Sequence, residues 1–189
     1  MPSSSAANRG AAGAEAVSVD QLSQFYIFRG LSPEKLSRIA SIIELKGVAE
    51  GEVVIKDGDE GDTFYLLLEG EVEITKLLVM RMSRQEVDQT DKSLIRLKSD
   101  PHPQFGKPAF GEMALLTETS KRSATVLATQ PSRLGVISHQ RFLELCESDM
   151  EIGYRVFRSI AGEISNRLGK TNQDVLNLTT ALSFVLTSH

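Results

Sequence analysis

One stretch of the chain, FGEMALLTETSKRSATV from Phe110 to Val126, concentrates residues whose side chains could hold a small anion. Arg122 offers a planar guanidinium that matches the oxygens of a phosphate group. The turn Glu112 to Leu116 offers backbone N–H groups at the start of a helical turn, which also favour an anion. Glu112 cannot favour an anion itself, so its suitable role is to accept a hydrogen bond from a sugar hydroxyl and to pair with Arg122.

The neighbours of these two charged residues suit the same small ligand. Gly111 lets the backbone approach a ligand closely because it has no side chain. Met113 and Ala114 lie in the turn that follows, and Ser123 and Thr125 add hydroxyl groups to the same wall. The stretch as a whole therefore predicts a site for a phosphate joined to a sugar.

Each charged residue also has a simpler interpretation when it is taken alone. Arg122 could be a surface residue that leaves a turn, and Glu112 could be an ordinary helix start. The joint spacing favours a binding site, because both residues and the polar loop between them lie between predicted strands.

The elements that must position this stretch are mainly short strands. From Gly51 onward, short predicted strands are separated by glycine-rich turns, a pattern typical of a β-barrel or sandwich. Leu77 to Lys92 is predicted to be a long hairpin excursion, and a binding site for a partner is one role that it could have. The predicted strands are Val53 to Lys56, Thr63 to Leu68, Glu71 to Lys76, Ser93 to Leu97, Ser123 to Ala128 and Arg133 to Ser138.

Helices are predicted at both ends of this strand region. Ser32 is a suitable N-cap and Pro33 suits the first helical position, so a helix should begin there. A short helix is expected from His139 to Cys146, and a long one from Asp149 onward. The fold class is therefore α+β, with a domain at residues 20–150 and a C-terminal helix at 151–187.

The C-terminal helix carries an apolar heptad pattern that predicts a parallel homodimer. The alternative is a helix that lies along its own domain, which also needs an apolar stripe. Thr171 is the polar residue in this pattern. Its simpler role would be to specify the register of the paired helices, or to lie in the core as a hydrogen-bonded threonine. The residues of this heptad seam are Phe157, Ala161, Ile164, Leu168, Thr171, Val175, Leu178, Leu182 and Val185.

Composition excludes several classes of function. Residues 1–19 lack periodicity and a signal-peptide core, so a disordered tail is predicted and secretion is not. The single cysteine, Cys146, permits no disulfide framework, and the longest apolar runs are too short to span a membrane. The net charge of −4 argues against nucleic-acid binding. A cytoplasmic protein is expected.

Catalysis has little support in the sequence. The histidines His102, His139 and His189 are scattered without metal-ligand spacing. The acidic turn Asp57 to Asp62 lacks the spacing of a calcium loop. No enzyme activity, metal or cofactor is therefore expected.

The segment from Gln21 to Thr171 resembles the cyclic nucleotide-binding domain family, above all its bacterial catabolite activator branch. The resemblance implies a β jelly-roll barrel whose ligand is cAMP, with cGMP less favoured. It also implies that Gly111 and Glu112 hold the ribose, and that Ala114, Arg122 and Ser123 hold the cyclic phosphate. The motifs that carry the resemblance are the 110–126 stretch, GEVVI at 51–55, GDEGDTFY at 58–65 and GEVEI at 70–74.

The resemblance extends to the C-terminal helix, where a threonine of the bacterial relatives reaches the purine. Thr171 and Asn172 are therefore candidates for base recognition. Lys121 departs from the pattern, because many family members have proline there. The DNA-binding domain of the transcriptional relatives is not expected here, because the sequence ends at His189.

The expected function is a cyclic nucleotide sensor that signals through an unidentified protein partner. Two alternatives remain open: a ligand-free interaction domain of the same fold, and a fragment of a cAMP-dependent transcription regulator.

Overall fold

The computed structural model describes residues 16–81, 87–101, 106–117 and 121–187. Most of the predicted N-terminal tail lies outside these residues. Within them, Val17 is already buried, and the Ser18 hydroxyl accepts a 3.2 Å hydrogen bond from the Gln21 N–H at the start of the first helix. The ordered domain thus begins before its expected start at Asp20.

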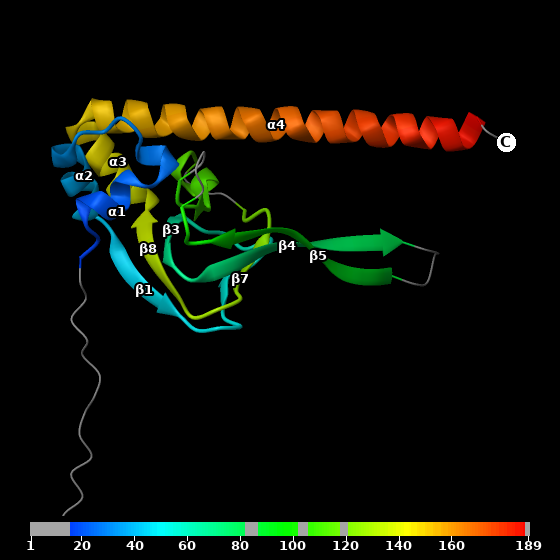
Figure 1. Cartoon of the computed structure of the whole chain (residues 1–189), viewed down its shortest axis with the longest axis horizontal. Coiled ribbons are helices and arrows are strands. Elements are labelled where there is room, and N and C mark those ends of the chain that lie inside the picture. The colour runs from blue at the N-terminus through cyan, green and yellow to red at the C-terminus, as the bar shows by residue number, and fades with distance from the viewer. Residues whose placement is uncertain (1–15, 82–86, 102–105, 118–120, 188–189) are drawn as a thin grey trace, which may run out of the picture.

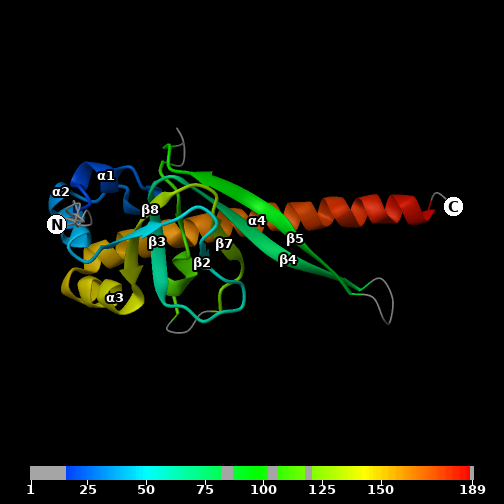
Figure 2. The same ribbon diagram turned by 90° about the horizontal axis from the view of Figure 1, so that it is seen from below.

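The described residues contain two antiparallel sheets of four strands each, which face one another (Figures 1 and 2). Their strand orders are β1-β8-β3-β6 and β2-β7-β4-β5. Leu67 and Leu134 of the first sheet pack with Val72 and Val126 of the second in one buried cluster. The strands are β1 (Glu44–Val48), β2 (Val53–Ile55), β3 (Thr63–Glu69), β4 (Glu71–Arg81), β5 (Val87–Lys98), β6 (Ala109–Phe110), β7 (Thr125–Ala128) and β8 (Ser132–Ser138).

Helices gather at one end of this barrel, and the last of them runs along its side (Figure 1). Leu22, Ile39, Phe142 and Ile152 are buried in the helical core, which also includes residues of β3. The α+β jelly-roll prediction is therefore confirmed. The helices are α1 (Val19–Ser23), α2 (Pro33–Ala40), α3 (His139–Ser148) and α4 (Met150–Thr187), with 3-10 turns η1 (Tyr26–Phe28) and η2 (Glu112–Leu115).

Local sequence signals located most boundaries correctly. The Ser32 hydroxyl accepts a hydrogen bond from the Lys35 N–H at 3.4 Å, so α2 begins at Pro33 as predicted. β1 was missed, because its burial alternates only weakly and it is held by pairing with the distant β8. The two-residue β6 is too short to leave a pattern.

The predicted hairpin excursion is present. β4 and β5 pair from Glu71 with Lys98 out to Arg81 with Val87, and the tip at 82–86 lies outside the described residues. The hairpin projects from the same end of the barrel as α4 (Figures 1 and 2).

The long helix α4 has two parts with different surroundings. Ile152, Val156 and Ile160 are fully buried, and Phe157 and Ile164 of the heptad seam pack against the helical core. The alternative of a helix laid along its own domain is thus correct for the first part. None of the described helices is long and apolar enough to cross a bilayer.

Beyond residue 164 the seam faces solvent. Its large apolar residues are 55–71 % exposed, and they are Leu168, Val175, Leu178, Leu182 and Val185. The second part of α4 therefore carries an apolar stripe that its own domain does not cover.

Candidate functional site

The site begins where β6 turns into η2. Gly111, between them, has a φ of 77°, a left-handed conformation that glycine adopts without strain. A Cβ at this position would lie 3.1 Å from Nη1 of Arg122. Glycine therefore serves both the turn and the close approach of the guanidinium.

Arg122 is held in place by its backbone and its side chain. Its N–H donates to the Asp59 carbonyl at 2.8 Å, and its carbonyl accepts from the Gly58 N–H at 2.9 Å. Its Nη2 donates to the Thr63 carbonyl at 2.8 Å and to the Thr63 hydroxyl at 3.0 Å. The acidic turn 57–62 thus anchors Arg122.

Gly61 in the same turn makes room for the guanidinium. A Cβ there would lie 2.4 Å from Nε of Arg122, closer than non-bonded atoms can approach. The side chain of Arg122 therefore occupies a slot between Gly61 and Gly111.

The charge of Arg122 is not balanced inside this slot. The residue is 9 % exposed, and it forms no ion pair with a carboxylate in the described part of the chain. A buried cation without a counter-charge is unfavourable because it has lost most of its hydration. An anion bound beside Arg122 would balance this charge.

The Glu112 carboxylate pairs with a different arginine from the one predicted. Glu112 is 6 % exposed, and its Oε1 accepts a 2.7 Å hydrogen bond from Nη1 of Arg167 on α4. The predicted pair with Arg122 is wrong, because Arg122 points to Thr63 instead. Arg167 also donates to Glu163 one helical turn earlier, at 3.0 Å.

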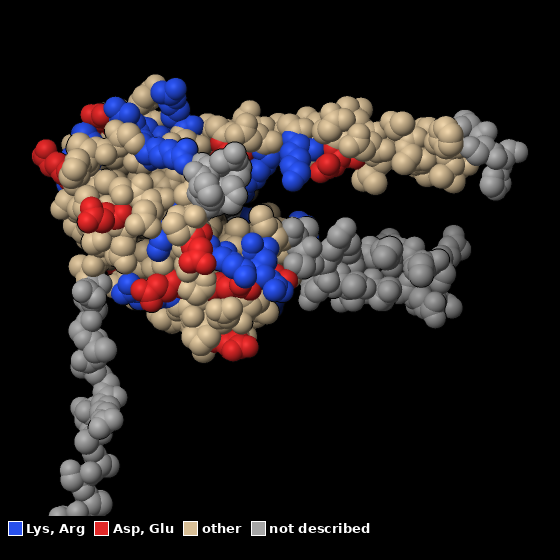
Figure 3. Space-filling view, viewed as in Figure 1, with Lys and Arg blue, Asp and Glu red and all other residues tan. Residues whose placement is uncertain are grey.

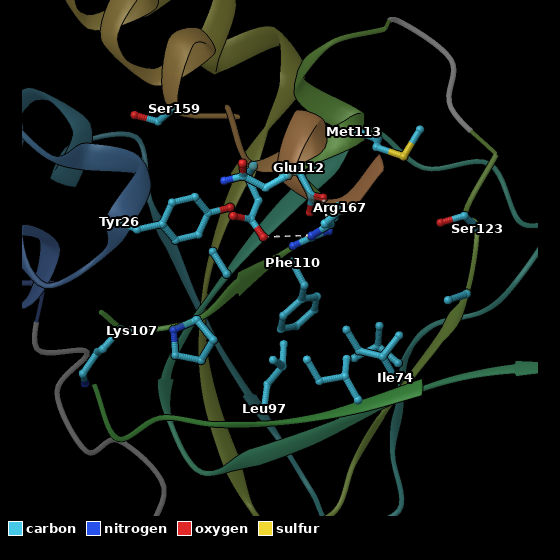
Figure 4. Close-up of a pocket in the computed structure, with 18 of the residues that line it drawn as sticks. Tyr26, Ile74, Leu97, Lys107, Phe110, Glu112, Met113, Ser123, Ser159 and Arg167 are labelled. Atoms are coloured by element: carbon cyan, nitrogen blue, oxygen red, sulfur yellow. Dashed lines mark hydrogen bonds and ion pairs between the residues drawn. The ribbon is translucent and has the colours of Figure 1, made fainter. Parts of the chain in front are cut away.

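Glu112 and Arg122 both line a cavity of about 1430 Å³ between the barrel and α4. Ile74, Leu97 and Phe110 form an apolar wall on the barrel side (Figure 4). The cavity exceeds the roughly 300–1,000 Å³ of typical small-molecule pockets. A flat, apolar ring system would fit against this wall beside the two charged residues.

The cavity is more basic than the chain as a whole. Arg155, Arg158 and Lys170 line it from α4, and Arg96 and Lys98 line it from β5. Lys and Arg side chains gather on both sides of the hollow below α4 (Figure 3). Clefts lined by one sign of charge attract ligands of the opposite sign.

The structure brings most of the predicted site residues to this cavity. Among the walls of the cavity are Gly111, Glu112, Met113, Arg122, Ser123 and Thr171.

Three predicted residues do not line the cavity. Ala114 is fully buried, and its N–H donates to the Gly111 carbonyl at 3.0 Å. The Thr125 hydroxyl accepts from the Asp57 N–H at 3.0 Å, so it supports the turn. Asn172 lies exposed on α4.

Two residues that line the cavity were not identified from the sequence. Arg167 lies four residues after Glu163 and four before Thr171, so helical spacing alone could have placed it on the same face. Tyr26 of η1 also lines the cavity, with its hydroxyl turned toward Glu112 (Figure 4). Nothing in the sequence near Tyr26 indicates this position.

Comparison with known proteins relates this chain to proteins that bind cyclic nucleotides. Residues 106–149 match the family model of the cyclic nucleotide-binding domain. The cAMP-dependent protein kinase regulatory subunit of Dictyostelium discoideum is 33 % identical over 125 residues, which are 66 % of this chain and 34 % of that subunit. The match thus spans about a third of the length of this relative.

Solved structures share the fold at lower identity. The Thermus thermophilus catabolite activator protein has a TM-score of 0.64 and 23 % identity over 82 % of this chain and 63 % of its own. A cyclic nucleotide-binding domain from Methylobacillus flagellatus has a TM-score of 0.63 and 18 % identity over 84 % and 80 %. The family match contains Glu112 and Arg122, and the fold agrees with it. Residues 106–149 of this chain therefore resemble the cyclic nucleotide-binding domain, and the fold of the described residues agrees with that resemblance.

Proposed function

We propose that the protein binds a cyclic mononucleotide, with cAMP preferred over cGMP, and acts as a regulatory sensor rather than an enzyme. The observation that carries the proposal is the buried guanidinium of Arg122, which has no carboxylate partner among the described residues. A cyclic phosphate has one delocalised negative charge, and this charge would neutralise Arg122.

The remaining groups of the ligand find partners around this anchor. Glu112 lines the same cavity and can accept a hydrogen bond from the ribose 2′-hydroxyl. The purine would lie against the apolar wall of Ile74, Leu97 and Phe110. The hydroxyl of Thr171 would reach the base from α4, and Asn172 beside it stays a candidate for the same role.

The preference for cAMP rests on two supports. Thr171 lines the cavity, and in the bacterial relatives a threonine near this point on the helix reaches the purine. The Dictyostelium relative is by its name a cAMP-dependent regulatory subunit. The proposal is therefore cAMP first and cGMP second.

A ligand in this cavity would contact two separate elements, the barrel and α4. Such a ligand favours the arrangement of the two elements that binds it better, and so biases their equilibrium. The exposed stripe of α4 would join two copies as a homodimer, and an unidentified protein partner would receive the signal.

One observation favours the alternative of a ligand-free interaction domain. The Glu112 carboxylate already has a partner in Arg167, so the residue that should hold the ribose is satisfied without it. In that alternative Glu112 serves to fasten α4 to the barrel, and no nucleotide is needed.

Isothermal titration calorimetry with cAMP and then cGMP tests the proposal. We expect saturable binding that Arg122→Ala weakens at least about tenfold, because a hydrogen-bonded charge pair is lost. The matched control is Arg141→Ala, which removes an exposed arginine of α3 that does not line the cavity. Its affinity should change little.

Circular dichroism and thermal melts of each variant ensure that a loss of binding is not a loss of fold. Absence of heat with either nucleotide at millimolar concentration would contradict the proposal and favour the ligand-free interaction domain.

A further inference from the structure

The hydroxyl of Tyr26 is buried at the edge of the site without a hydrogen-bond partner among the described residues. Its neighbours are charged: the Glu112 carboxylate raises the pKa of the Tyr26 hydroxyl and the Arg167 guanidinium lowers it. Figure 4 shows the hydroxyl turned toward the Glu112 carboxylate. Buried polar groups nearly always have partners, so an orphan of this kind calls for a functional explanation.

The segment that carries Tyr26 is rigidly placed relative to Glu112. Phe25, Ile27 and Phe28 around it are buried in the helical core. The Lys107 N–H, just before β6, donates to the Gln24 carbonyl at 2.8 Å. Tyr26 and the turn that bears Glu112 are therefore parts of one connected frame.

Tyr26 is available as a donor. Burial, and then the nearby Glu112 carboxylate, raise the pKa of the Tyr26 phenol well above its ordinary value. The hydroxyl therefore keeps its proton and can donate it in a hydrogen bond to a carboxylate.

Glu112 must serve more than one donor when a ribose is present. In this structure its Oε1 accepts from Arg167, whose side chain is 54 % exposed and is also bonded to Glu163. An exposed arginine with a second carboxylate partner can leave at modest cost, because water and Glu163 continue to solvate it. The buried Tyr26 hydroxyl has no such alternative.

We propose that Tyr26 is a positioning residue for Glu112: its hydroxyl donates to the carboxylate when Glu112 accepts the ribose 2′-hydroxyl, taking the place of Arg167. Tyr26 thereby sets the preference for ribose over 2′-deoxyribose. The inference rests on the proposed function, and it assigns a specificity role to the N-terminal turn η1, outside the 110–126 stretch.

Calorimetric titration of wild type and Tyr26→Phe with cAMP and with 2′-deoxy-cAMP tests this inference. Tyr26→Phe should weaken cAMP binding about tenfold and change 2′-deoxy-cAMP binding less than about twofold, because only the ribose uses Glu112 as its acceptor. The unliganded variant should melt no lower than wild type, since its lost hydroxyl had no partner.

Two further variants separate positioning from structure. Glu112→Gln should abolish the ribose preference, and Tyr26→Phe in that background should add no further loss. Tyr154→Phe is the matched control, because Tyr154 is 64 % exposed on α4 and should leave both affinities unchanged.

The outcomes are distinguishable. The wild type could prefer cAMP over its deoxy analogue while Tyr26→Phe keeps the same affinity ratio, for example because the variant loses affinity for both ligands equally. That result would overturn the inference alone. Wild type that binds neither nucleotide would overturn the proposed function and the inference with it.

Discussion

Glu112 and Arg167 are 55 residues apart in the chain, yet Oε1 of the first accepts a 2.7 Å hydrogen bond from Nη1 of the second. The pair joins the turn η2 to the helix α4 across the cavity. Glu112 is nearly buried whereas Arg167 is about half exposed. The link is thus a buried carboxylate satisfied by a cation that water can reach.

A double-mutant cycle on this pair should reveal a favourable coupling. Arg167→Gln leaves the Glu112 carboxylate buried without its charged partner, so we expect a loss of about 1–2 kcal/mol, reduced from the value for a fully buried pair by the exposure of Arg167. In the Glu112→Gln background the same substitution should be nearly neutral. Urea denaturation measures both, with the exposed Arg158→Gln as a control. Strictly additive effects would show that the pair contributes nothing.

The slot around Arg122 should make Gly61 intolerant of any side chain. The Cβ of Gly61→Ala would lie 2.4 Å from Nε of Arg122, so the guanidinium must leave Thr63. We expect a stability loss of about 1–3 kcal/mol and a larger proportional loss of cAMP affinity, because the phosphate loses its aligned donor.

Gly47→Ala is the control for this substitution, since no heavy atom lies within 4 Å of its added Cβ. Chemical denaturation and calorimetry would compare the two variants. Full cAMP affinity in Gly61→Ala would show that the phosphate does not depend on this position of Arg122.

Stability should fall in acid through Asp149, which links α2 to the α3–α4 junction. Lys35 Nζ donates to Asp149 at 2.7 Å and Arg38 donates to it at 2.8 Å. The hydrogen bond from Lys35 is the main cause that holds the pKa of Asp149 below its ordinary value. A carboxylate of this kind contributes stability above its unfolded pKa of about 3.9, and that contribution is lost as the pH falls through the folded pKa.

Asp149→Asn should therefore flatten the acid limb of the stability curve between about pH 5 and pH 2. Denaturant midpoints at a series of pH values measure this slope. The exposed Asp174→Asn should keep the wild-type slope. An unchanged slope in Asp149→Asn would assign the acid sensitivity to other carboxylates.

The exposed stripe of α4 should hold two copies together. Val175 and Leu182 of the heptad seam are 55 % and 60 % exposed, and a parallel partner helix would cover them. We expect a dimer in sedimentation velocity at high micromolar concentration. Val175→Glu combined with Leu182→Glu should give monomers, because each charge would be buried in the seam.

Gln173→Glu, a substitution off the seam, is the control for this experiment and should remain dimeric. A wild-type protein that sediments as a monomer at these concentrations would contradict the prediction. The apolar side chains of Leu176, Phe184 and Leu186, which lie off the seam, would then require another partner.

Sequence by itself determined the elements whose signals are local. The capping residue Ser32, the alternation of Val72 and Ile74 in β4 and the glycine-rich turns indicated the sheet region and the start of α2. The spacing of Glu112 and Arg122 likewise indicated their common site, because the turn and the strand that carry them are encoded within seventeen residues of sequence, from 110 to 126. Such signals depend only on the preferences of neighbouring residues.

Tertiary structure alone decided the partners of these residues. Arg122 bonds to Thr63 because β3 lies beside it in the fold, and Glu112 bonds to Arg167 because α4 packs across the cavity. Tyr26 reaches the same site from a turn 86 residues earlier than Glu112. No local pattern records such contacts, since they arise from the way in which distant elements bury their apolar faces together.

The heptad seam illustrates the same division. Its regular spacing specified a helix with one apolar stripe, as the structure has it. Which part of that stripe meets the parent domain depended on how far packing against the helical core extends: Ile164 packs against it, whereas Leu168 is exposed. Periodicity encodes the existence of an apolar face, whereas only packing selects what covers it.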